Sequence, residues 1–180
     1  MLSIKIDDKE FYDENTNKFT YIKGQTLVLE HSLISISKWE SKFHKSFLHN
    51  LKNLSQAESQ YYIRCMTITK NVPDEVYMCL SKKNIEDINN YINDPMTGTT
   101  FSKSNGSSDR RPVTNELIYY QMIEYGIPVE FERWHLNRLL TLINVCSIKN
   151  QPLKKMGRTE LANRNRALNA KRRKQLNTTG

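Results

Sequence analysis

The sequence predicts a mainly α protein of the α+β class, with a small N-terminal antiparallel β element, a helical domain and a basic C-terminal helical arm. Three observations support this prediction. Apolar and polar residues alternate near the start, apolar residues then recur at steps of three or four, and positive charge gathers in the last 32 residues. We therefore assign residues 1–148 to one globular body and residues 149–180 to an arm.

The β element is expected over residues 1–30. The segment LSIKI alternates apolar and polar residues, which is typical of a strand with one buried face. Two more short strands are expected between Phe11 and Glu30, because the segments DENTN and KG supply turn-forming residues between apolar runs. Together these strands would form a small antiparallel element.

Helices are expected over residues 32–147. Large apolar residues share one face of the first helix: Leu33, Ile36, Trp39, Phe43 and Phe47. Ser32 is its expected N-cap. A second helix is expected to begin at Ser55, because Ser55 and Glu58 have the spacing of a capping box. In that motif each side chain satisfies a free backbone N–H group at the start of the helix.

The middle of the chain predicts further helices and one loop. Residues 71–80 predict a short helix with Pro73 in its first turn, and the isoleucines of NIEDINNYIND predict another. Residues 97–112 are rich in glycine, serine and asparagine, so we expect a flexible surface loop there. The helix that follows is expected to end at Gly126, since glycine adopts the left-handed conformation at little cost.

The segment FERWHLNRLLTLINVC, which starts at Phe131, predicts an amphipathic helix of roughly five turns. Its apolar stripe comprises Leu136, Leu139, Leu140, Ile143 and Cys146. Trp134 is expected to wedge the helix against its neighbours. His135 raises a catalytic alternative, since histidine transfers protons near neutral pH. Its candidate partners, Glu132 and Cys146, have no spacing diagnostic of catalysis, so we expect a structural histidine.

Motifs that carry chemistry are missing from the sequence. It contains no H-E-x-x-H or C-x-x-C pattern and no glycine-rich phosphate loop. Three widely spaced cysteines lie among apolar residues and are expected to be free thiols: Cys65, Cys79 and Cys146. We therefore expect a protein that is not an enzyme, with no catalytic residues, no metal site and no cofactor.

The location of the protein is also constrained by the sequence. No apolar run approaches the ~20 residues of a membrane span, and the first residues lack the pattern of a signal peptide. The sequence therefore predicts a cytosolic protein without a membrane partner.

The arm concentrates positive charge. From Lys149 onward the chain has ten basic residues and one acidic residue, a net charge of +9, whereas residues 1–148 have a net charge of −1. A helix is expected from Thr159, its expected N-cap residue, to Leu176, with Leu161 and Leu168 seven residues apart. The candidate partner-binding residues of the arm are Arg158, Arg164, Arg166, Lys171, Arg172, Arg173 and Lys174.

Three roles for the arm remain open at the level of the sequence. A basic helix can pair with an acidic protein, neutralise the phosphates of a nucleic acid, or remain a solvated tail. The arm has no aromatic residue on which bases could stack, which disfavours single-stranded nucleic acid.

Four segments together resemble a known family: HSLISISKWESKFHKSFL, YIRCMTI, ELIYYQMIEYGIPVEFERWHLNRLLTLINVCSIKNQP and RNRALNAKRRKQLNTTG. They are similar to the tail assembly chaperones of long-tailed bacteriophages, and the resemblance runs along nearly the whole chain. It implies a mostly helical, non-enzymatic protein in the cytoplasm of the infected bacterium. Such a protein would bind the phage tape-measure protein and help to recruit tail-tube proteins.

The charged arm departs from what this family usually shows. The departure leaves open an alternative, a structural protein of the virion in the tail or at the head–tail junction. Its arm would contact DNA or neighbouring subunits, and a homo-oligomer is also open. Because aromatic residues dominate interface hot spots, Tyr119, Tyr120 and Phe131 are candidate apolar anchors for a partner. The alternative, in which these three are ordinary core residues, is the favoured one.

Overall fold

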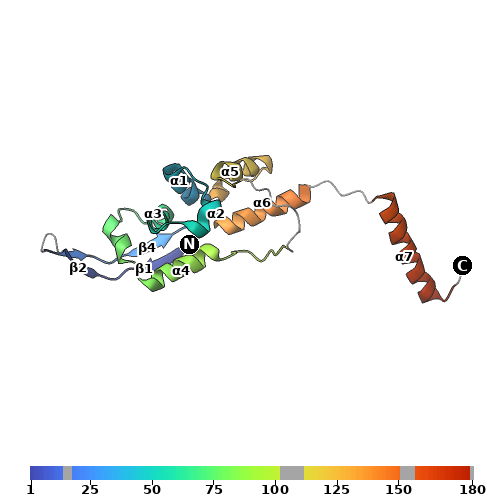
Figure 1. Cartoon of the computed structure of the whole chain (residues 1–180), viewed down its shortest axis with the longest axis horizontal. Coiled ribbons are helices and arrows are strands. Elements are labelled where there is room, and N and C mark those ends of the chain that lie inside the picture. The colour runs from blue at the N-terminus through green and yellow to red at the C-terminus, as the bar shows by residue number, and fades with distance from the viewer. Residues whose placement is uncertain (14–17, 102–111, 151–156, 179–180) are drawn as a thin grey trace. The chain divides into compact units, whose positions relative to one another are not determined.

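The computed structural model describes residues 1–13, 18–101, 112–150 and 157–178 (Figure 1). The chain divides into two compact units, Met1–Ser147 and Ile148–Gly180, and each is described by itself. The fold class is the predicted one, mainly α with a small antiparallel β element at the N-terminus. The predicted flexible loop 97–112 falls largely on residues 102–111, which lie outside the described residues.

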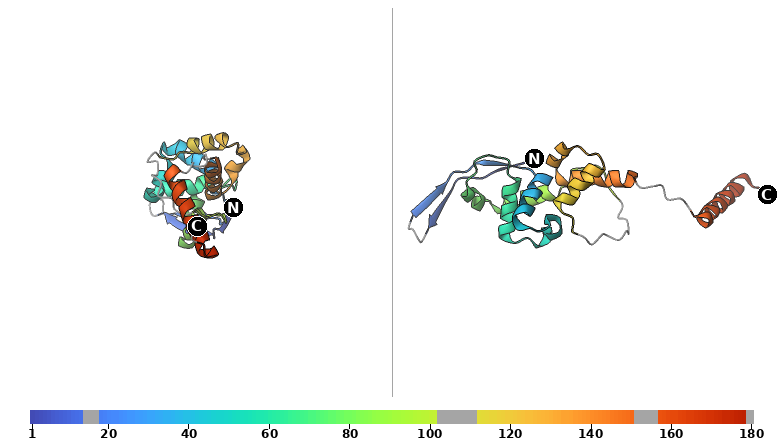
Figure 2. Two further views of the ribbon diagram at one scale, coloured as in Figure 1. Left: turned by 90° about the vertical axis from the view of Figure 1, so that its right-hand side faces the viewer. Right: turned by 90° about the horizontal axis from the view of Figure 1, so that it is seen from above.

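Within the described residues, four short strands form two separate antiparallel ladders. Strand β1 (Leu2–Lys5) pairs with β4 (Thr26–Leu29), and β2 (Lys9–Asp13) pairs with β3 (Lys18–Ile22). The β2–β3 ladder projects beyond the helices of the body (Figure 2). The sequence predicted three strands in all, and this was wrong by one. The chain changes partner near Gly24, at the predicted KG turn, so residues 18–22 and residues 26–29 belong to different ladders.

Gly24 marks the junction between the two ladders. A Cβ atom at this position would lie 2.2 Å from the carbonyl oxygen of Ile6 and 2.7 Å from the nitrogen of Asp8, so no larger residue fits. The backbone N–H of Gly24 donates to Oδ1 of Asp8 at 2.7 Å, and the hydroxyl of Tyr21 donates to Oδ2. The close backbone approach and these two bonds fix where one ladder ends and the other begins.

The first helix is shorter than predicted. Helix α1 (Leu33–Phe43) ends at His44, which has a left-handed φ of 53°, and Phe47 begins a separate short helix, α2 (Phe47–Asn50). The five apolar residues of the predicted stripe therefore lie on two elements. Ser32 occupies the N-cap position of α1, but its side chain makes no capping bond there.

The capping box of the second helix is confirmed. In α3 (Gln56–Met66), the Ser55 hydroxyl accepts from the backbone N–H of Glu58, and the Glu58 carboxylate accepts from the backbone N–H of Ser55. A short 3₁₀ turn, η1 (Leu51–Asn53), precedes this helix. After it come the 3₁₀ helix η2 (Asp74–Cys79), which follows Pro73, and α4 (Lys82–Asn93), which is capped by Ser81.

The later helices of the body include one interruption that the sequence did not predict. Helix α5 (Asn115–Glu124) is followed by Gly126, whose φ of 66° is the predicted left-handed one. Next come a 3₁₀ helix, η3 (Val129–Arg133), and α6 (Leu136–Asn150). The predicted continuous helix from Phe131 is therefore wrong at residues 134–135. The chain is extended there, and the N–H of Leu136 donates to the carbonyl of His31 at 2.9 Å.

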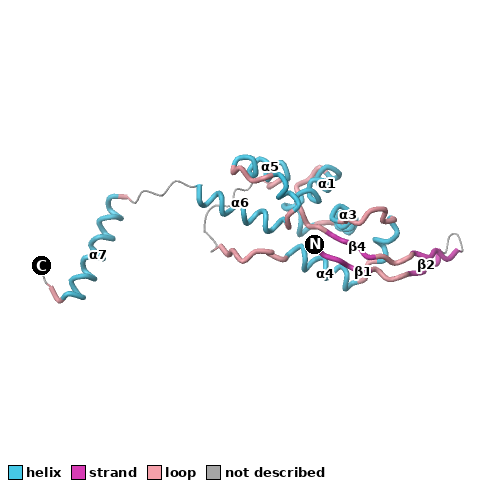
Figure 3. The backbone as a smooth tube through the Cα atoms, turned by 180° about the vertical axis from the view of Figure 1, so that it is seen from behind, coloured by secondary structure: helices cyan, strands magenta, loops and turns pink. Residues whose placement is uncertain are grey.

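The β1–β4 ladder lies inside the body. In Figures 1 and 3 it lies between α4 on one side and α3 on the other. Strand β4 is extended by backbone bonds to the end of α3, from Glu30 N to Met66 O and from Ile68 N to Val28 O, each 2.8 Å. The largest fully buried side chains come from both strands and helices: Ile6, Leu27, Leu29, Leu33, Ile36, Trp39, Phe47, Met66, Ile88, Ile118, Met122 and Leu136.

The second unit contains helix α7 (Arg158–Leu176), which ends at Asn177 in the left-handed conformation. Its N-cap residue is Gly157, so the helix starts slightly before Thr159, the cap that the sequence predicted. Every residue of α7 is exposed to solvent.

Candidate functional site

His135 belongs to a cluster of packed rings. Its ring lies 4.9 Å from the ring of Tyr91 and 5.0 Å from that of His31, and its Nε2 lies 2.9 Å from the carbonyl oxygen of Tyr91. Because a carbonyl only accepts, Nε2 must carry the proton. Nδ1 is then a bare acceptor, and it is buried without a hydrogen-bond partner among the described residues.

His31 is the other half of this buried pair. It is 2% exposed, and burial together with the neighbouring His135 lowers its pKa to about 3. Its Nδ1 lies 2.6 Å from the hydroxyl of Tyr62, and its backbone N–H donates to the hydroxyl of Tyr91. Since its carbonyl accepts from Leu136, His31 joins α3, α4 and α6. Sequence reasoning passed over His31, because a histidine beside a strand end carries no motif.

In the part of the chain that the structure describes, neither Glu132 nor Cys146 is hydrogen-bonded to this pair. The carboxylate of Glu132 accepts from the hydroxyl of Tyr119 at 2.8 Å, and no described hydrogen bond joins His135 to Glu132 or Cys146. Burial raises the pKa of the nearby Cys65 thiol to about 11, so this thiol stays protonated at neutral pH. The arrangement is that of two neutral histidines that hold helices together.

A second buried polar group, Glu40, ties three helices together. Its Oε1 accepts from the backbone N–H of Phe47 at 2.7 Å, and its Oε2 accepts from the backbone N–H of Asn115 at 2.8 Å. These are the first residues of α2 and α5, so one carboxylate satisfies free N–H groups at two helix starts. Burial raises the pKa of Glu40, although these two bonds act in the opposite direction. The sequence prediction did not single out Glu40, whose only signal is an acidic residue directly after the core residue Trp39.

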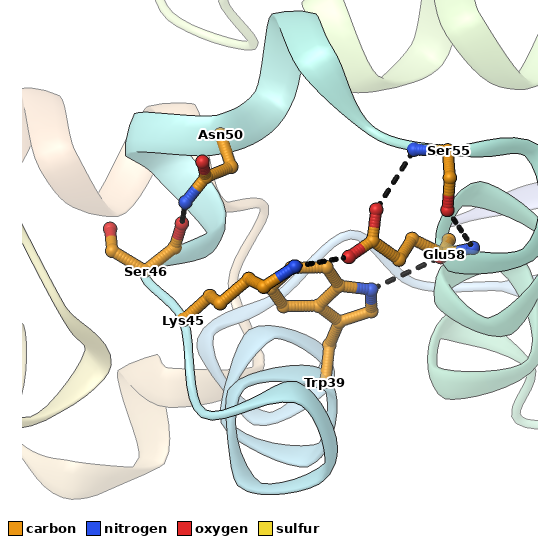
Figure 4. A network of polar contacts seen from close by, with 6 residues as sticks. All are labelled: Trp39, Lys45, Ser46, Asn50, Ser55 and Glu58. Carbon is orange, nitrogen blue, oxygen red and sulfur yellow. Dashed lines mark hydrogen bonds and ion pairs between the residues drawn. The ribbon is translucent and has the colours of Figure 1, made fainter.

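Glu58 of α3 is bonded to Trp39 of α1 and so joins these two helices (Figure 4). The indole Nε1 of Trp39 donates to the carbonyl of Glu58 at 3.1 Å, and Lys45 Nζ lies 3.0 Å from Glu58 Oε1. The backbone bond from Ser55, then Lys45, lower the pKa of the Glu58 carboxyl to about 2. Together, Glu40 and Glu58 make α1 a support for α2, α3 and α5.

Helix α5 rests on this support and presents an apolar surface on its outer side. Ile118 and Met122 point into the core. On the other side, Leu117, Tyr120 and Ile123 are 39%, 60% and 76% exposed, and we call these three residues the α5 outer stripe. Glu116 and Glu124 are exposed on the same side of the helix, as the 3.6-residue period requires. The stripe is a two-turn apolar surface with an acidic border.

The three aromatic anchors predicted from the sequence differ in their exposure to solvent. Tyr120 is exposed on the α5 outer stripe. Tyr119 is half-buried, and burial followed by its bond to Glu132 raises its pKa to about 12. Phe131 is also half-buried and stacks on Trp134 with ring centroids 4.0 Å apart, and the Arg138 guanidinium lies 4.0 Å from the centre of the Trp134 ring.

Exposed aromatic residues also occur on the β2–β3 ladder. Residues directly opposite each other in an antiparallel pair share a face, so Tyr12, Phe19 and Tyr21 lie on one face. They are 51%, 74% and 58% exposed, and the Tyr12 and Phe19 rings are 4.9 Å apart. Sequence reasoning did not single out this face, although the alternation in EFYD and KFTYI could have indicated it.

Two hollows in the described part of the body are lined by different kinds of residue. One, of about 390 Å³, is lined mainly by apolar residues of α2, α3 and α4, and another, of about 580 Å³, lies beside Tyr21 and Pro73. Within the described ranges, no group of three or more His, Cys, Asp or Glu residues is placed to hold a metal ion. None of the helices in those ranges has both the length and the apolar character needed to cross a membrane.

The seven basic residues predicted to bind a partner all lie on α7, where each is exposed. Comparisons of the chain with protein-family models, with curated proteins and with solved structures find no match.

Proposed function

We propose that the protein is an assembly factor of bacteriophage tails, which binds the tape-measure protein and keeps it soluble while tail-tube subunits are recruited. It works by binding other macromolecules and not by catalysis, in the cytoplasm of the host bacterium. The resemblance of residues 31–48, 62–68, 116–152 and 164–180 to tail assembly chaperones supports the proposal.

The α5 outer stripe is the observation that carries this proposal. Amphipathic helices are recognised by apolar surfaces that accept side chains at steps of three and four. The stripe offers three such side chains over two turns, and its acidic border favours a partner with basic flanks. Because Glu40 fixes the start of α5, the stripe is presented without a large ordering cost on binding.

Co-expression with the tape-measure protein tests the proposal. We expect the soluble yield of the tape-measure protein to rise when the chain is present. The double variant Tyr120→Ser/Ile123→Ser should abolish the rise, since both side chains are exposed and contribute little to the core. The matched control is Ile68→Ser/Met78→Ser, which removes two exposed apolar side chains elsewhere in the body.

Two results would contradict the proposal. One is an unchanged soluble yield with the wild-type chain. The other is equal loss of yield in the stripe variant and in its matched control, which would mean that general surface polarity and not α5 matters.

A second function, a structural component of the virion, is favoured by one observation. Helix α7 exposes all of its residues, as expected of an arm that reaches a neighbouring subunit or the packaged genome. Protein analysis of purified mature particles separates the two functions. The chain at stoichiometric copy number in those particles would replace the assembly-factor proposal, and its absence would support it.

A further inference from the structure

We infer that α7 binds double-stranded DNA by lying in the major groove. This inference concerns the arm alone and does not rest on the proposed role in tail assembly. The helix has seven cationic side chains and one carboxylate in 19 residues, a net charge of +6. A surface of that charge density is the electrostatic footprint of a phosphate-binding element.

The angular distribution of the charge separates the candidate ligands. At about 100° per residue, Arg158, Arg166 and Arg173 lie together on one side of the helix. Arg164, Lys171 and Lys174 lie on the opposite side. We call these two sets side one and side two. Cations on both sides require a ligand whose negative charges surround the helix.

A membrane surface does not meet this requirement. A helix that lies on a bilayer needs a broad apolar face opposite its cations. The exposed leucines Leu161 and Leu168 form only a narrow seam between Arg164 and Arg172, so insertion of that seam would bury charge. The flat acidic surface of a protein would satisfy one side and leave the other in solvent.

The major groove of B-form DNA does meet the requirement. It is roughly 12 Å wide and admits a helix of about 10–12 Å diameter, with phosphates along both walls. At 1.5 Å per residue, α7 is about 28 Å long, so it can follow the groove for most of a helical turn.

The remaining residues of α7 are compatible with close approach to the bases. Short side chains lie between the cations: Ala162, Asn163, Asn165, Ala167, Asn169 and Ala170. Asparagine amides have the geometry to bond the edge of adenine in this groove. The helix therefore combines phosphate contacts on both walls with side chains able to reach base edges.

Fluorescence anisotropy with a labelled DNA duplex of about 20 base pairs tests the inference on the full chain. We expect binding that weakens by at least a hundredfold between about 50 mM and about 200 mM salt, because several counterions are released. Detectable binding that does not respond to salt, or no binding at about 50 mM salt, would overturn the inference.

Two matched triple variants test whether both sides take part. One is Arg158→Gln/Arg166→Gln/Arg173→Gln, and the other is Arg164→Gln/Lys171→Gln/Lys174→Gln. Each removes three charges, so each should weaken binding at least tenfold at about 100 mM salt and reduce the salt slope by about 3. If one variant binds like the wild type, the helix uses one side only and the groove assignment is wrong.

Three controls separate the groove from other sources of binding. The body variant Lys38→Gln/Lys42→Gln/Lys70→Gln removes three exposed charges outside the arm and should bind DNA like the wild type. An RNA duplex, whose major groove is too narrow for a helix, should bind at least tenfold more weakly than DNA. Polyglutamate tests attraction to acidic protein. Three results would each overturn the inference. They are equal binding of DNA and RNA, tighter binding of polyglutamate than of DNA, and a loss of DNA binding in the body variant as large as that in the α7 variants.

Discussion

At the scale of single residues, buried polar groups decide how the body responds to pH. His31 and His135 are held neutral among Tyr62, Tyr91 and the start of α6, and each has a pKa lowered mainly by burial. An unfolded chain would protonate both histidines near pH 6.5. The folded state therefore binds fewer protons than the unfolded state in mild acid.

We predict that the free energy of unfolding falls as the pH is lowered from about 6.5 towards 3. A folded pKa of about 3 for His31 means a loss of about 2–3 kcal/mol by pH 4.5, since each pKa unit corresponds to about 1.4 kcal/mol. Urea unfolding at pH 7.5, 6.0 and 4.5 measures this loss. His31→Phe is the comparison, because it removes the titrating group and keeps an aromatic ring. If the variant and the wild type lose stability equally over this range, His31 is not responsible.

The carboxylate of Glu40 gives a second prediction at this scale. Glu40→Gln replaces one acceptor by an NH₂ group, which then faces a backbone N–H at the start of α2 or α5. One buried donor is left unsatisfied, so unfolding should become easier by about 1–3 kcal/mol. Glu86→Gln, on the exposed side of α4, is the control and should change stability by less than about 0.5 kcal/mol. Similar losses in both variants would show that Glu40 does not support α2 and α5.

At the scale of elements, local signals and tertiary contacts account for different parts of the fold. The capping box of Ser55 and Glu58 and the left-handed Gly126 are short-range features, and the sequence predicted both. The break before α6 depends on the carbonyl of His31, which is more than a hundred residues away in the chain. Periodicity alone does not reveal such a break, because the apolar pattern continues on both sides of it.

The candidate site was predictable to a similar degree. The cations of α7 are evident from composition, and Tyr120 was named as an anchor from residue type. Leu117 and Ile123 were not named as anchors, because an exposed apolar residue in a helix has the same sequence pattern as a buried one. Which side of α5 faces solvent is decided by Glu40 and the core, which are contacts distant in sequence.

The junction between the two ladders gives a prediction for an element. Gly24→Ala would place a Cβ atom 2.2 Å from the carbonyl oxygen of Ile6, and this atom belongs to backbone that cannot move aside without breaking a ladder. We expect a loss of stability of more than about 2 kcal/mol, comparable with severe overpacking. Gly98→Ala is the control, since nothing lies within 4 Å of the added atom. Thermal unfolding compares the two variants, and an equal Tm in both would contradict the packing at this junction.

At the scale of the whole molecule, the chain has two units with different physical characters. The body buries its apolar core between Ile4 and Ile143, whereas the helix of the second unit exposes every residue. The α5 outer stripe offers apolar contact, and α7 offers charge. On our account these surfaces bind different partners, so a change in one leaves the other intact.

Hydrogen exchange of the chain alone and in complex with the tape-measure protein tests the binding role of α5 most directly. The account predicts slower exchange of the backbone amides of residues 116–124 in the complex, since a docked helix shields α5 and suppresses its local opening. Unchanged exchange in α5, with protection confined to other segments of the body, would contradict it.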